Sequence, residues 1–484
     1  MSNLTNEAAS TSMWALMEKI GLMGIQFIIS MVLARLLSPD DYGVIAMLLI
    51  FISIAQNFID SGFGSALVRK QNCTEADYST AFIFNVFVGI ICYLLLFLSA
   101  PLVSDFYHLD LLTPVLRWYG LVLIINSLFI VQNAILTQRL AFKVKAKSSI
   151  ISNATSGLFA LFLAYYGFGV WALVAQTLIS AITNLVILTS YAKWKPVLMF
   201  SVESFRYLWN FGSKLLASAL ISTLYGNMYS IIIGKFYTKA DLGFYNRGSQ
   251  TSRLLPDIVS DMFGKSSFPL LSKVQNDRDA LINTFRRFTQ ISAFLSFPLI
   301  FLMVVIAKPF ILFLLTDKWI ESVPYIWIFS IAILTTPIGR INLNLILALG
   351  RSDLMLKADI IKKSVGISTI CLLLYLGVFK SPQGLAIVSM ILELFIYSVN
   401  LYYAKEVLKI SYMVQIKDFM PYLLASFVMA IVTYFAICYI ESNLLQLIIG
   451  PIVAFAVYYL LTYYIIKTPF YKQKMGLIKQ KFNH

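Results

Sequence analysis

The chain has 484 residues, of which 59% are hydrophobic and only 13% charged, and its mean hydropathy is +0.79. Soluble domains carry about 45–50% apolar and about 25% charged residues, so this composition excludes an ordinary soluble protein. The formal net charge of +15 would suit a nucleic-acid partner, but most Lys and Arg residues lie in short loops between apolar runs, which argues against that class.

About fourteen apolar runs approach the roughly 20 residues that a helix needs to cross a bilayer. Backbone groups in lipid must hydrogen-bond within their own segment, so these runs predict α-helices, and the alternation typical of barrel strands is absent. In chain order the predicted spans are 12–37, 42–63, 79–101, 112–133, 149–166, 170–190, 210–234, 249–270, 288–314, 324–348, 356–378, 383–404, 419–440 and 444–466. We therefore predict an all-α polytopic membrane protein, in which the eighth span is the most polar.

The basic residues are divided unevenly between the two sets of alternating loops. About 25 Lys and Arg residues fall in one set and in the C-terminal tail, against about 6 in the other, which is the positive-inside pattern. Both termini are therefore expected in the cytoplasm, with Asp105 and Ser381 on the opposite side. Segment 1–7 lacks a basic region and a small-residue cleavage site, so we expect no cleaved signal peptide.

An internal repeat divides the chain. Segments 35–43 and 235–243 share an Asp and a Gly at equivalent places, and the Phe-Gly pair at 63–64 recurs at 263–264, all at an offset of 200 residues. The offset covers six predicted spans, an even number, so the two halves would run parallel in the membrane. A duplication is favoured over chance agreement of short motifs. The predicted domains are an N-terminal lobe (1–195), a C-terminal lobe (196–409) and two appended spans with a basic tail (410–484).

The eighth span carries a stripe of charge. Arg253, Asp257, Asp261 and Lys265 follow one another at intervals of four, which places them on one face of a regular helix. Charges are costly against lipid, so this face must meet protein or water. It is either one wall of a hydrated cavity or a set of internally neutralised pairs that hold helices together. Pro256 lies inside the stripe and is expected to kink the helix.

Three further acids lie within predicted spans. Asp60, Glu18 and Glu393 lack an obvious cation on the same helix face. Each is a candidate site for a coupling ion or proton, together with Asp257 and Asp261. The alternative for each is a cross-helix ion pair, or for Asp60 a cap at the cytoplasmic end of its helix.

Two cations suit a phosphate group. Lys214 and Arg340 have no helical acid nearby, and each lies four residues from an amide, Asn210 and Asn344 respectively. A guanidinium or ammonium group suits a diphosphate, and amides suit sugar hydroxyls. These four residues, with Arg253 and Lys265, are the predicted substrate-binding set. For Lys214 the alternative is an ammonium that reaches the cytoplasmic interface.

Signatures of catalysis and of resident cofactors are missing. The only histidines are His108, in a predicted exterior loop, and the terminal His484, and the four cysteines have no metal-binding spacing. Segment 264–266 ends like a phosphate-binding loop, but residue 259 is Val where that motif needs Gly. We therefore expect no catalytic residues, no metal and no ATP site, and energy from an H⁺ or Na⁺ gradient or from the substrate.

Two segments resemble a known family. Segment 34–47 (ARLLSPDDYGVIAM) resembles the first helical hairpin of the polysaccharide transporter family, and segment 60–70 (DSGFGSALVRK) resembles the end of its second helix. That family belongs to the multidrug/oligosaccharidyl-lipid/polysaccharide flippase superfamily. The resemblance implies an inner-membrane flippase that moves an undecaprenyl-pyrophosphate-linked repeat unit by alternating access, for assembly of lipopolysaccharide, capsule or exopolysaccharide. It also implies that the last two spans guide the lipid tail.

Two rival functions remain open. One is a multidrug exporter of the same superfamily, which would need an acidic, apolar pocket for organic cations. The other is a membrane glycosyltransferase or polymerase, which would generally need a substantial loop with acidic or histidine catalysts, and this chain has none. The expected partners are membrane lipids and the lipid-linked oligosaccharide, with a polysaccharide polymerase and glycosyltransferases as possible further partners.

Overall fold

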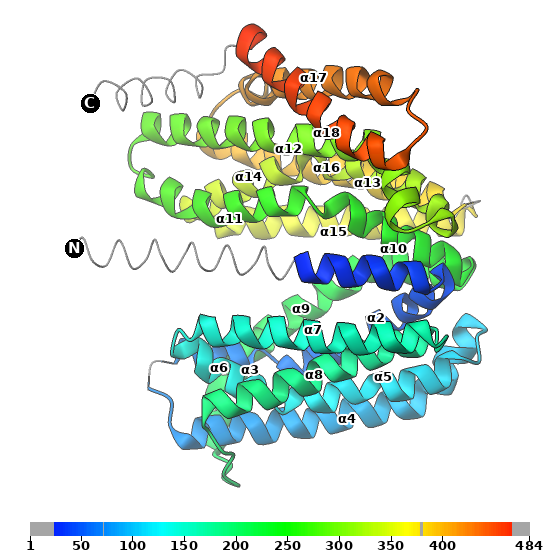
Figure 1. The fold of residues 1–484 in the computed structure, drawn as a ribbon. Coiled ribbons are helices and arrows are strands. Elements are labelled where there is room, and N and C mark those ends of the chain that lie inside the picture. Colours follow the sequence, from blue (N-terminus) through cyan, green and yellow to red (C-terminus); the bar gives the residue numbers. More distant parts are fainter. Residues whose placement is uncertain (1–23, 71, 378–380, 467–484) are drawn as a thin grey trace, which may run out of the picture. The chain divides into compact units, whose positions relative to one another are not determined.

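The computed structural model describes residues 24–466 except 71 and 378–380, and every regular element in these ranges is a helix (Figure 1). The chain forms two compact units, Met1–Gly243 and Phe244–His484. Within the described residues, eleven helices are long and apolar enough to cross a membrane, and a shorter apolar helix covers Gly24–Leu36. The polytopic, all-helical prediction is therefore confirmed, whereas the count of fourteen spans stays a prediction.

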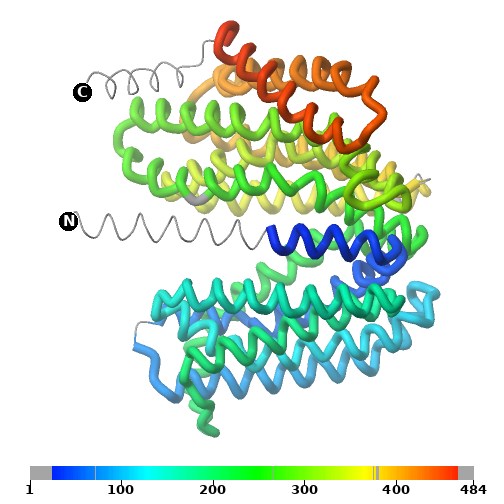
Figure 2. The backbone as a smooth tube through the Cα atoms, in the orientation of Figure 1, coloured from blue at the N-terminus to red at the C-terminus, as the bar shows by residue number. Residues whose placement is uncertain are grey.

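The first unit contains eight labelled helices after the helix Gly24–Leu36. They are α2 (Pro39–Asp60), α3 (Phe63–Arg69), α4 (Glu75–Tyr107), α5 (Leu112–Ser127), α6 (Ile130–Gln138), α7 (Phe142–Tyr165), α8 (Val170–Ala192) and α9 (Val202–Phe236). The pairs α4–α5 and α7–α8 are antiparallel hairpins (Figure 2). The helix α10 (Lys239–Arg253) begins in this unit and continues into the next.

The second unit contains the remaining helices. They are α11 (Pro256–Lys273), α12 (Arg278–Leu314), the 3-10 turn η1 (Asp317–Ser322), α13 (Val323–Ala332), the 3-10 turn η2 (Ile333–Thr335), α14 (Thr336–Ala348), α15 (Ser352–Tyr375), α16 (Pro382–Leu408), α17 (Tyr412–Ile437), α18 (Asn443–Leu460) and the π-helical turn η3 (Leu461–Ile465). The long α12 packs against α11, α13, α17 and α18. Three helices, α10, α11 and α15, are not among the eleven apolar helices.

The two repeated segments begin their helices in the same way. The Ser38 side chain accepts a hydrogen bond from the Asp41 backbone N–H, and the Asp41 carboxylate accepts one from the Ser38 backbone N–H at 2.9 Å. Thr238 and Asp241 form the same reciprocal pair, with backbone-to-side-chain distances of 3.0 and 3.1 Å. Such a box satisfies two donors that a helix start leaves open, so the repeat of sequence at this offset is also a repeat of local structure.

These two helix starts also lie against each other. A Cβ atom added at Gly43 would overlap the carbonyl oxygen of Lys239, and one added at Gly243 would overlap the carbonyl oxygen of Pro39. Gly43 meets Lys239 and Gly243 meets Pro39, and each of these pairs is the counterpart of the other in the repeat. Such reciprocal contacts are those of two segments related by a local two-fold axis. Glycine is needed at both places because the backbones approach too closely for any side chain. Whether the complete halves superpose stays a prediction.

Four of the predicted spans are interrupted. Ser61 (φ 40°) and Gly62 (φ 70°) take the left-handed conformation between α2 and α3, and the helix formed by α5 and α6 breaks at residues 128–129. In the second unit, α10 ends at Arg253 and α11 begins at Pro256, while η2 separates α13 from α14. Proline has no backbone N–H and so kinks or ends a helix, and α11 begins at Pro256, which confirms the predicted break in direction there. Interrupted membrane helices are tolerated where protein or a cavity covers the freed backbone groups.

Candidate functional site

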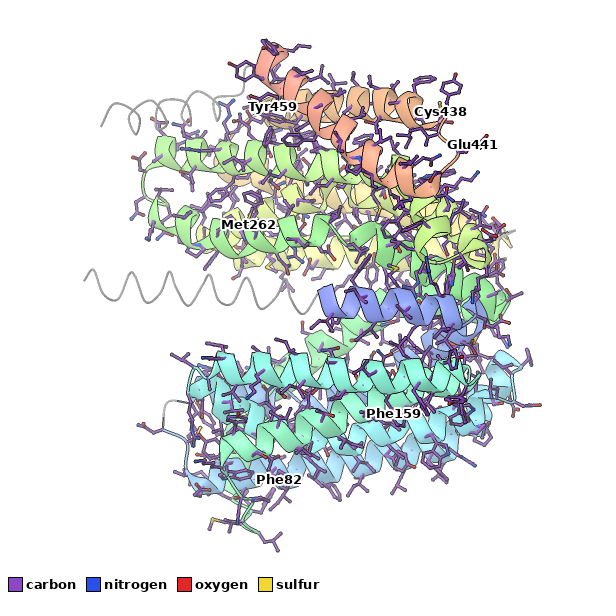
Figure 3. The ribbon with its side chains drawn as sticks, viewed as in Figure 1. Phe82, Phe159, Met262, Cys438, Glu441 and Tyr459 are labelled. Atoms are coloured by element: carbon purple, nitrogen blue, oxygen red, sulfur yellow. The ribbon has the colours of Figure 1, made fainter. Side chains whose placement is uncertain are left out.

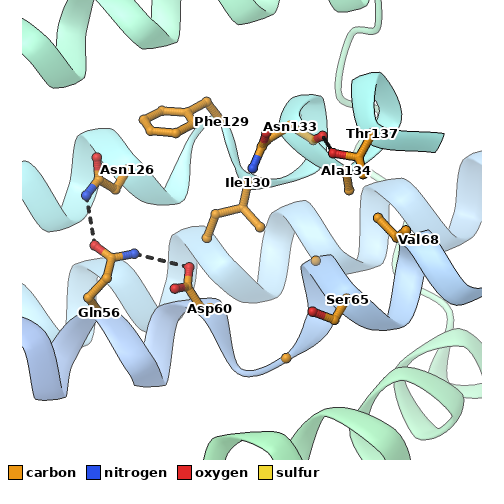
Figure 4. A pocket seen from close by; sticks show the side chains of 12 residues that line it. Gln56, Asp60, Ser65, Val68, Asn126, Phe129, Ile130, Asn133, Ala134 and Thr137 are labelled. Atoms are coloured by element: carbon orange, nitrogen blue, oxygen red, sulfur yellow. Dashed lines mark hydrogen bonds between the residues drawn. The ribbon is translucent and has the colours of Figure 1, made fainter. Parts of the chain in front are cut away.

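A cavity of about 570 Å³ in the first unit lies where α2 and α5 are both interrupted (Figure 4). The side chain of Asp60, the last residue of α2, is beside it, and Phe129 and Ile130 border it at the start of α6. The lining residues are Gln56, Asp60, Gly62, Gly64, Ser65, Val68, Asn126, Phe129, Ile130, Asn133, Ala134 and Thr137. A polar cavity therefore forms at the depth where two helices give up their regular hydrogen bonding.

A chain of hydrogen bonds runs along one side of this cavity. Asn126 Nδ2 donates to Gln56 Oε1 at 2.8 Å, and Gln56 Nε2 donates to Asp60 Oδ1 at 3.2 Å (Figure 4). The Gln56 amide is thus oriented from both ends, with its N–H group directed at the carboxylate. A carboxylate accepts up to about four hydrogen bonds, so Asp60 retains acceptor capacity toward the cavity.

A second cavity, of about 310 Å³, lies among α5, α7 and α8. It shares the lining residues Asn126 and Phe129 with the first cavity, so the two cavities are adjacent. Its lining residues are Val122, Asn126, Phe129, Asn153, Ser156, Gln176, Thr177, Ser180, Ala181 and Asn184. We refer to the residues that line these two cavities as the amide groove.

Internal contacts hold several amides of the groove in place. Ser148 Oγ donates to Asn184 Oδ1 at 2.8 Å, and Asn153 Nδ2 donates to the Ser149 carbonyl at 2.8 Å. Asn153 Oδ1 also accepts a hydrogen bond from Gln26 Nε2 at 3.1 Å, so both ends of this amide are held by protein contacts. Asn184 uses only its oxygen in this way, which leaves its N–H group for a ligand or water.

The amide groove is chemically unusual for membrane helices. It carries six amide side chains, several hydroxyl groups and one carboxylate, on helices whose sequences are apolar enough to span a bilayer. Uncharged polar groups need a hydrogen-bonding partner when water is excluded, so this surface is suited to water or to a ligand rich in hydroxyl groups. Phe129, between the two cavities, offers an aromatic face of the kind on which a sugar ring stacks.

In the second unit, Arg340 is paired with an acid from a neighbouring helix. Its Nη1 atom lies 2.7 Å from Asp261 Oδ1, and the two side chains are 47% and 38% exposed. The sequence predicted no acid near Arg340 on its own helix, and the partner that the structure supplies comes from another helix, α11. One turn further along α14, Asn344 Nδ2 donates to the Gly264 carbonyl and to Ser267 Oγ, both at 2.7 Å. Both α14 side chains therefore tie α14 to α11.

The predicted stripe of four charges is not one regular helix face. The break between α10 and α11 separates Arg253 from Asp257, so the interval of four does not set their relative direction. Asp261 pairs with Arg340, and the side chain of Lys265 lies outside the described residues. The periodicity failed here because Pro256 restarts the helix.

Glu393 on α16 has cations near it from other helices. Arg253 and Lys362 both interact with its carboxylate electrostatically. Lys362 also forms an ion pair with Asp359 at 3.2 Å. The sequence correctly indicated that Glu393 has no cation on its own helix, and the tertiary structure supplies two from α10 and α15.

The remaining predicted residues are dispersed. Asn210 and Lys214 are both exposed on α9, in the first unit. Glu18 lies outside the described residues. A shared space for Lys214, Arg253 and Arg340 concerns both units and stays a prediction.

Most residues of the amide groove were not among the predicted site residues, because nearly all of those were chosen for their formal charge. A signal was present, because Gln176, Ser180 and Asn184 follow at intervals of four on one face of α8. Asn126 and Asn133 are seven residues apart across the α5–α6 break. Neutral amides repeated along one face of an apolar helix are the pattern that would have identified it.

The fold and the groove define a class: a polytopic α-helical membrane protein with a polar cavity inside its membrane helices. The structure is similar to the lipid II flippase MurJ in an inward closed conformation, with a TM-score of 0.73 and 17% identity over 93% of this chain and 100% of that one. It is also similar to an inward-facing MATE multidrug transporter, with a TM-score of 0.60 and 12% identity over 80% and 94% of the two chains. At these identities the likeness shows the fold alone.

Residues 32–324 match the family model described as polysaccharide biosynthesis protein, and the chain belongs to that family. It is 25% identical to the teichuronic acid biosynthesis protein TuaB of Bacillus subtilis, over 79% of this chain and 78% of TuaB. It is 24% identical to the succinoglycan biosynthesis transport protein ExoT of Rhizobium meliloti, over 66% and 65% of the two chains. It is 21% identical to the lipopolysaccharide biosynthesis protein WzxC of Escherichia coli, over 74% of each. The predicted family resemblance is confirmed.

Proposed function

We propose that this protein is a flippase that moves a polyprenyl-pyrophosphate-linked oligosaccharide across the bacterial inner membrane, for assembly of a surface polysaccharide. The observation that carries the proposal is the amide groove, a hydroxyl-compatible surface within apolar membrane helices. Family membership and the similarity to proteins named for teichuronic acid, succinoglycan and lipopolysaccharide synthesis support the same substrate class.

In this proposal the three parts of the substrate meet three environments. Sugar hydroxyls exchange hydrogen bonds with the amides of the groove, and a sugar ring stacks on Phe129. The negative diphosphate needs a cation during passage, because opposite charges attract more strongly in a low effective dielectric. Arg340, Arg253 and Lys214 are the candidates for that role. The lipid tail stays in the bilayer, so only the polar part needs a hydrated route.

Two rival functions fit the groove less well. An exporter of organic cations would favour acidic and apolar walls, whereas the groove holds one carboxylate, Asp60, among six amides. A glycosyltransferase or polymerase would make or break a glycosidic bond, whereas one relative is named a transport protein. A polymerase and glycosyltransferases are more plausible as partners that supply and consume the transported lipid.

Transport in reconstituted vesicles tests the proposal. The full chain is placed in liposomes with a defined lipid-linked oligosaccharide, and an impermeant sugar-modifying enzyme measures the fraction exposed outside over time. We expect faster exposure than in empty vesicles and no uptake of a cationic dye. Dye transport without movement of the sugar lipid would contradict the proposal.

Variants connect that assay to the groove. Gln176→Leu and Asn126→Leu should each slow translocation at least about tenfold, since each removes hydrogen bonds to the sugar that no apolar group replaces. Asn283→Leu removes an exposed amide from α12 and is the matched control, which should transport normally. Equal transport rates in all three variants would show that the groove does not bind the substrate during transport.

We further propose that an H⁺ or Na⁺ ion couples transport at Asp60. Asp60 is the carboxylate of the groove, it lies at the end of an interrupted helix, and its described partner is the neutral Gln56. Carboxylate and amide oxygens at a helix break are a ligand set that small cations bind. Asp257, Asp261 and Glu393 are weaker candidates, because Asp261 and Glu393 already have cationic neighbours.

The coupling proposal is tested with imposed gradients. Asp60→Asn keeps the size and most hydrogen bonds of the side chain but removes its charge, so transport should lose its dependence on an H⁺ or Na⁺ gradient. Asp60→Glu should retain that dependence in part. A gradient effect that is unchanged in Asp60→Asn would place the coupling site elsewhere.

A further inference from the structure

A third cavity, of about 900 Å³, lies in the second unit among α12, α13, α17 and α18. It is lined by Val304, Val305, Lys308, Pro309, Leu312, Trp327, Ala430, Ile431, Tyr434, Phe435, Ile437, Cys438, Ile440, Glu441, Asn443 and Gln446. Cys438 and Glu441 mark the turn between α17 and α18 in Figure 3. None of these residues belongs to the predicted substrate-binding set or to the amide groove, although α17 and α18 are the two spans that the family resemblance assigns to the lipid tail.

The cavity is at the end of this unit that the charge pattern assigns to the outer leaflet. It contains the C-terminal parts of α12 and α17 and the start of α18. The opposite ends of α12 and α17 carry the basic residues Arg278, Arg286 and Lys417. By the positive-inside rule that end is cytoplasmic, so the cavity opens near the outer headgroup region.

Two opposite charges border the cavity without pairing with each other. Lys308 and Glu441 are both exposed, and neither has an ion pair within the described part of the chain. Lys308 is six residues before the end of α12, which places its Cα about 9 Å below that end. An ammonium at that depth needs a negative partner, and a lipid phosphate is the nearest source.

A further acceptor is present at the level of Lys308. Pro309 has no backbone N–H, so the carbonyl of Val305 lacks its regular helical donor. Trp327 is held in the wall by a hydrogen bond from its Nε1 to the Val304 carbonyl at 3.0 Å. Ile431, Tyr434 and Phe435 are exposed on the α17 side and provide an apolar surface for acyl chains.

We infer that this cavity is a binding site for a zwitterionic aminophospholipid of the phosphatidylethanolamine type. Lys308 binds the phosphate, and the Glu441 carboxylate accepts a hydrogen bond from the primary ammonium. An anionic phosphatidylglycerol or a lipid diphosphate would meet Glu441 as a like charge. A phosphatidylcholine would carry the correct charges but has no N–H donor for Glu441.

Native mass spectrometry of the purified full-length protein tests this assignment. Phosphatidylethanolamine, phosphatidylcholine and phosphatidylglycerol with identical chains are titrated in turn. The wild type should retain phosphatidylethanolamine roughly fivefold better than phosphatidylglycerol, the effect of about one headgroup charge. It should also retain it better than phosphatidylcholine, whose ammonium has no N–H donor. Equal retention of the three lipids, or stronger retention of a polyprenyl pyrophosphate, would overturn the assignment.

Variants separate the two charges. Lys308→Gln should lose phosphatidylethanolamine roughly fivefold, and Glu441→Gln should shift the preference toward phosphatidylglycerol because the like charge is removed. Lys195→Gln removes an exposed lysine from the first unit and should bind as the wild type does. Unchanged retention in both Lys308→Gln and Glu441→Gln would refute the site.

Fluorescence provides a second readout if either variant does not purify. Brominated phosphatidylethanolamine should quench tryptophan emission of the wild type more than that of Trp327→Phe, because Trp327 lines the cavity. Equal quenching in both proteins would also refute the site. Neither measurement depends on transport, so the lipid site and the proposed flippase activity can fail independently.

Discussion

At the residue scale, two of the ion pairs in the second unit join different helices, although the pair of Lys362 and Asp359 lies along one helix. Arg340 and Asp261 are 79 positions apart in sequence, yet their side chains are 2.7 Å apart. Arg286 likewise donates two hydrogen bonds of 2.8 Å to the Asp418 carboxylate, and Gln290 donates a third to the same group. A charge in an apolar environment must find a partner, but neighbours on one helix are only some of those available.

The ion pair between Arg340 and Asp261 leads to a prediction that separates structure from transport. Arg340→Ala removes the ion pair with Asp261, so it should lower stability by about 0.5–1 kcal/mol, the scale of a partly exposed pair, and also abolish transport. The exchanged variant Arg340→Asp with Asp261→Arg should restore thermal stability. It should not restore transport if the guanidinium must contact phosphate from α14. Recovery of both properties would make the pair structural only.

Asp418 leads to a second prediction at this scale. The carboxylate side chain is only 3% exposed, and its loss would leave Arg286 without an acid. Breaking a fully buried pair costs about 3–5 kcal/mol. Because Arg286 is 40% exposed, Asp418→Ala should cost less than that but still lower the melting temperature clearly. Asp353→Ala removes an acid from an exposed pair with Arg351 and is the matched control. A melting temperature equal for the two variants would contradict this ranking.

At the element scale, interruptions decide where polar groups collect. The α2–α3 break depends on Gly62, which takes φ +70° and also contacts Gly212 of α9, where an added Cβ would be 2.7 Å from a backbone carbon. The α5–α6 break lies beside it, and both border the cavity that contains Asp60. Helix interruption thus supplies the cavity and presents a carboxylate to it.

The glycine contact between the two repeated helix starts gives the prediction at this scale. Gly43→Ala and Gly243→Ala should each reduce thermal stability by about 1–3 kcal/mol, because the new methyl group meets a backbone carbonyl that cannot rotate away. Gly226→Ala is the control, since nothing lies within 4 Å of its added Cβ. It should be neutral or stabilising by up to about 1 kcal/mol through helix propensity. Three equal melting temperatures would show that the close approach is not needed.

At the scale of the whole molecule, topology is the property that sequence predicts and labelling can decide. In a variant without the four native cysteines, new cysteines at Asp105 and Ser381 should react with an impermeant reagent in intact cells. A cysteine at Lys195 should react only after the membrane is opened. Labelling of the Lys195 position from outside would reverse the predicted orientation and, with it, the leaflet assigned to the lipid site.

The sequence by itself determined the class of this protein, because apolar runs of membrane-spanning length allow only helices and no tertiary contact can change that requirement. It also identified the repeated helix start, since the capping box of Ser38 and Asp41 is local and recurs at Thr238 and Asp241. Periodicity misjudged the charges, because Pro256 restarts the helix and the partner of Arg340 comes from α11. Only the tertiary structure brought Asp60, Asn126 and Gln176 to two adjacent cavities. Sequence reports which groups need a polar partner, whereas packing between distant helices decides which partner or cavity each one meets.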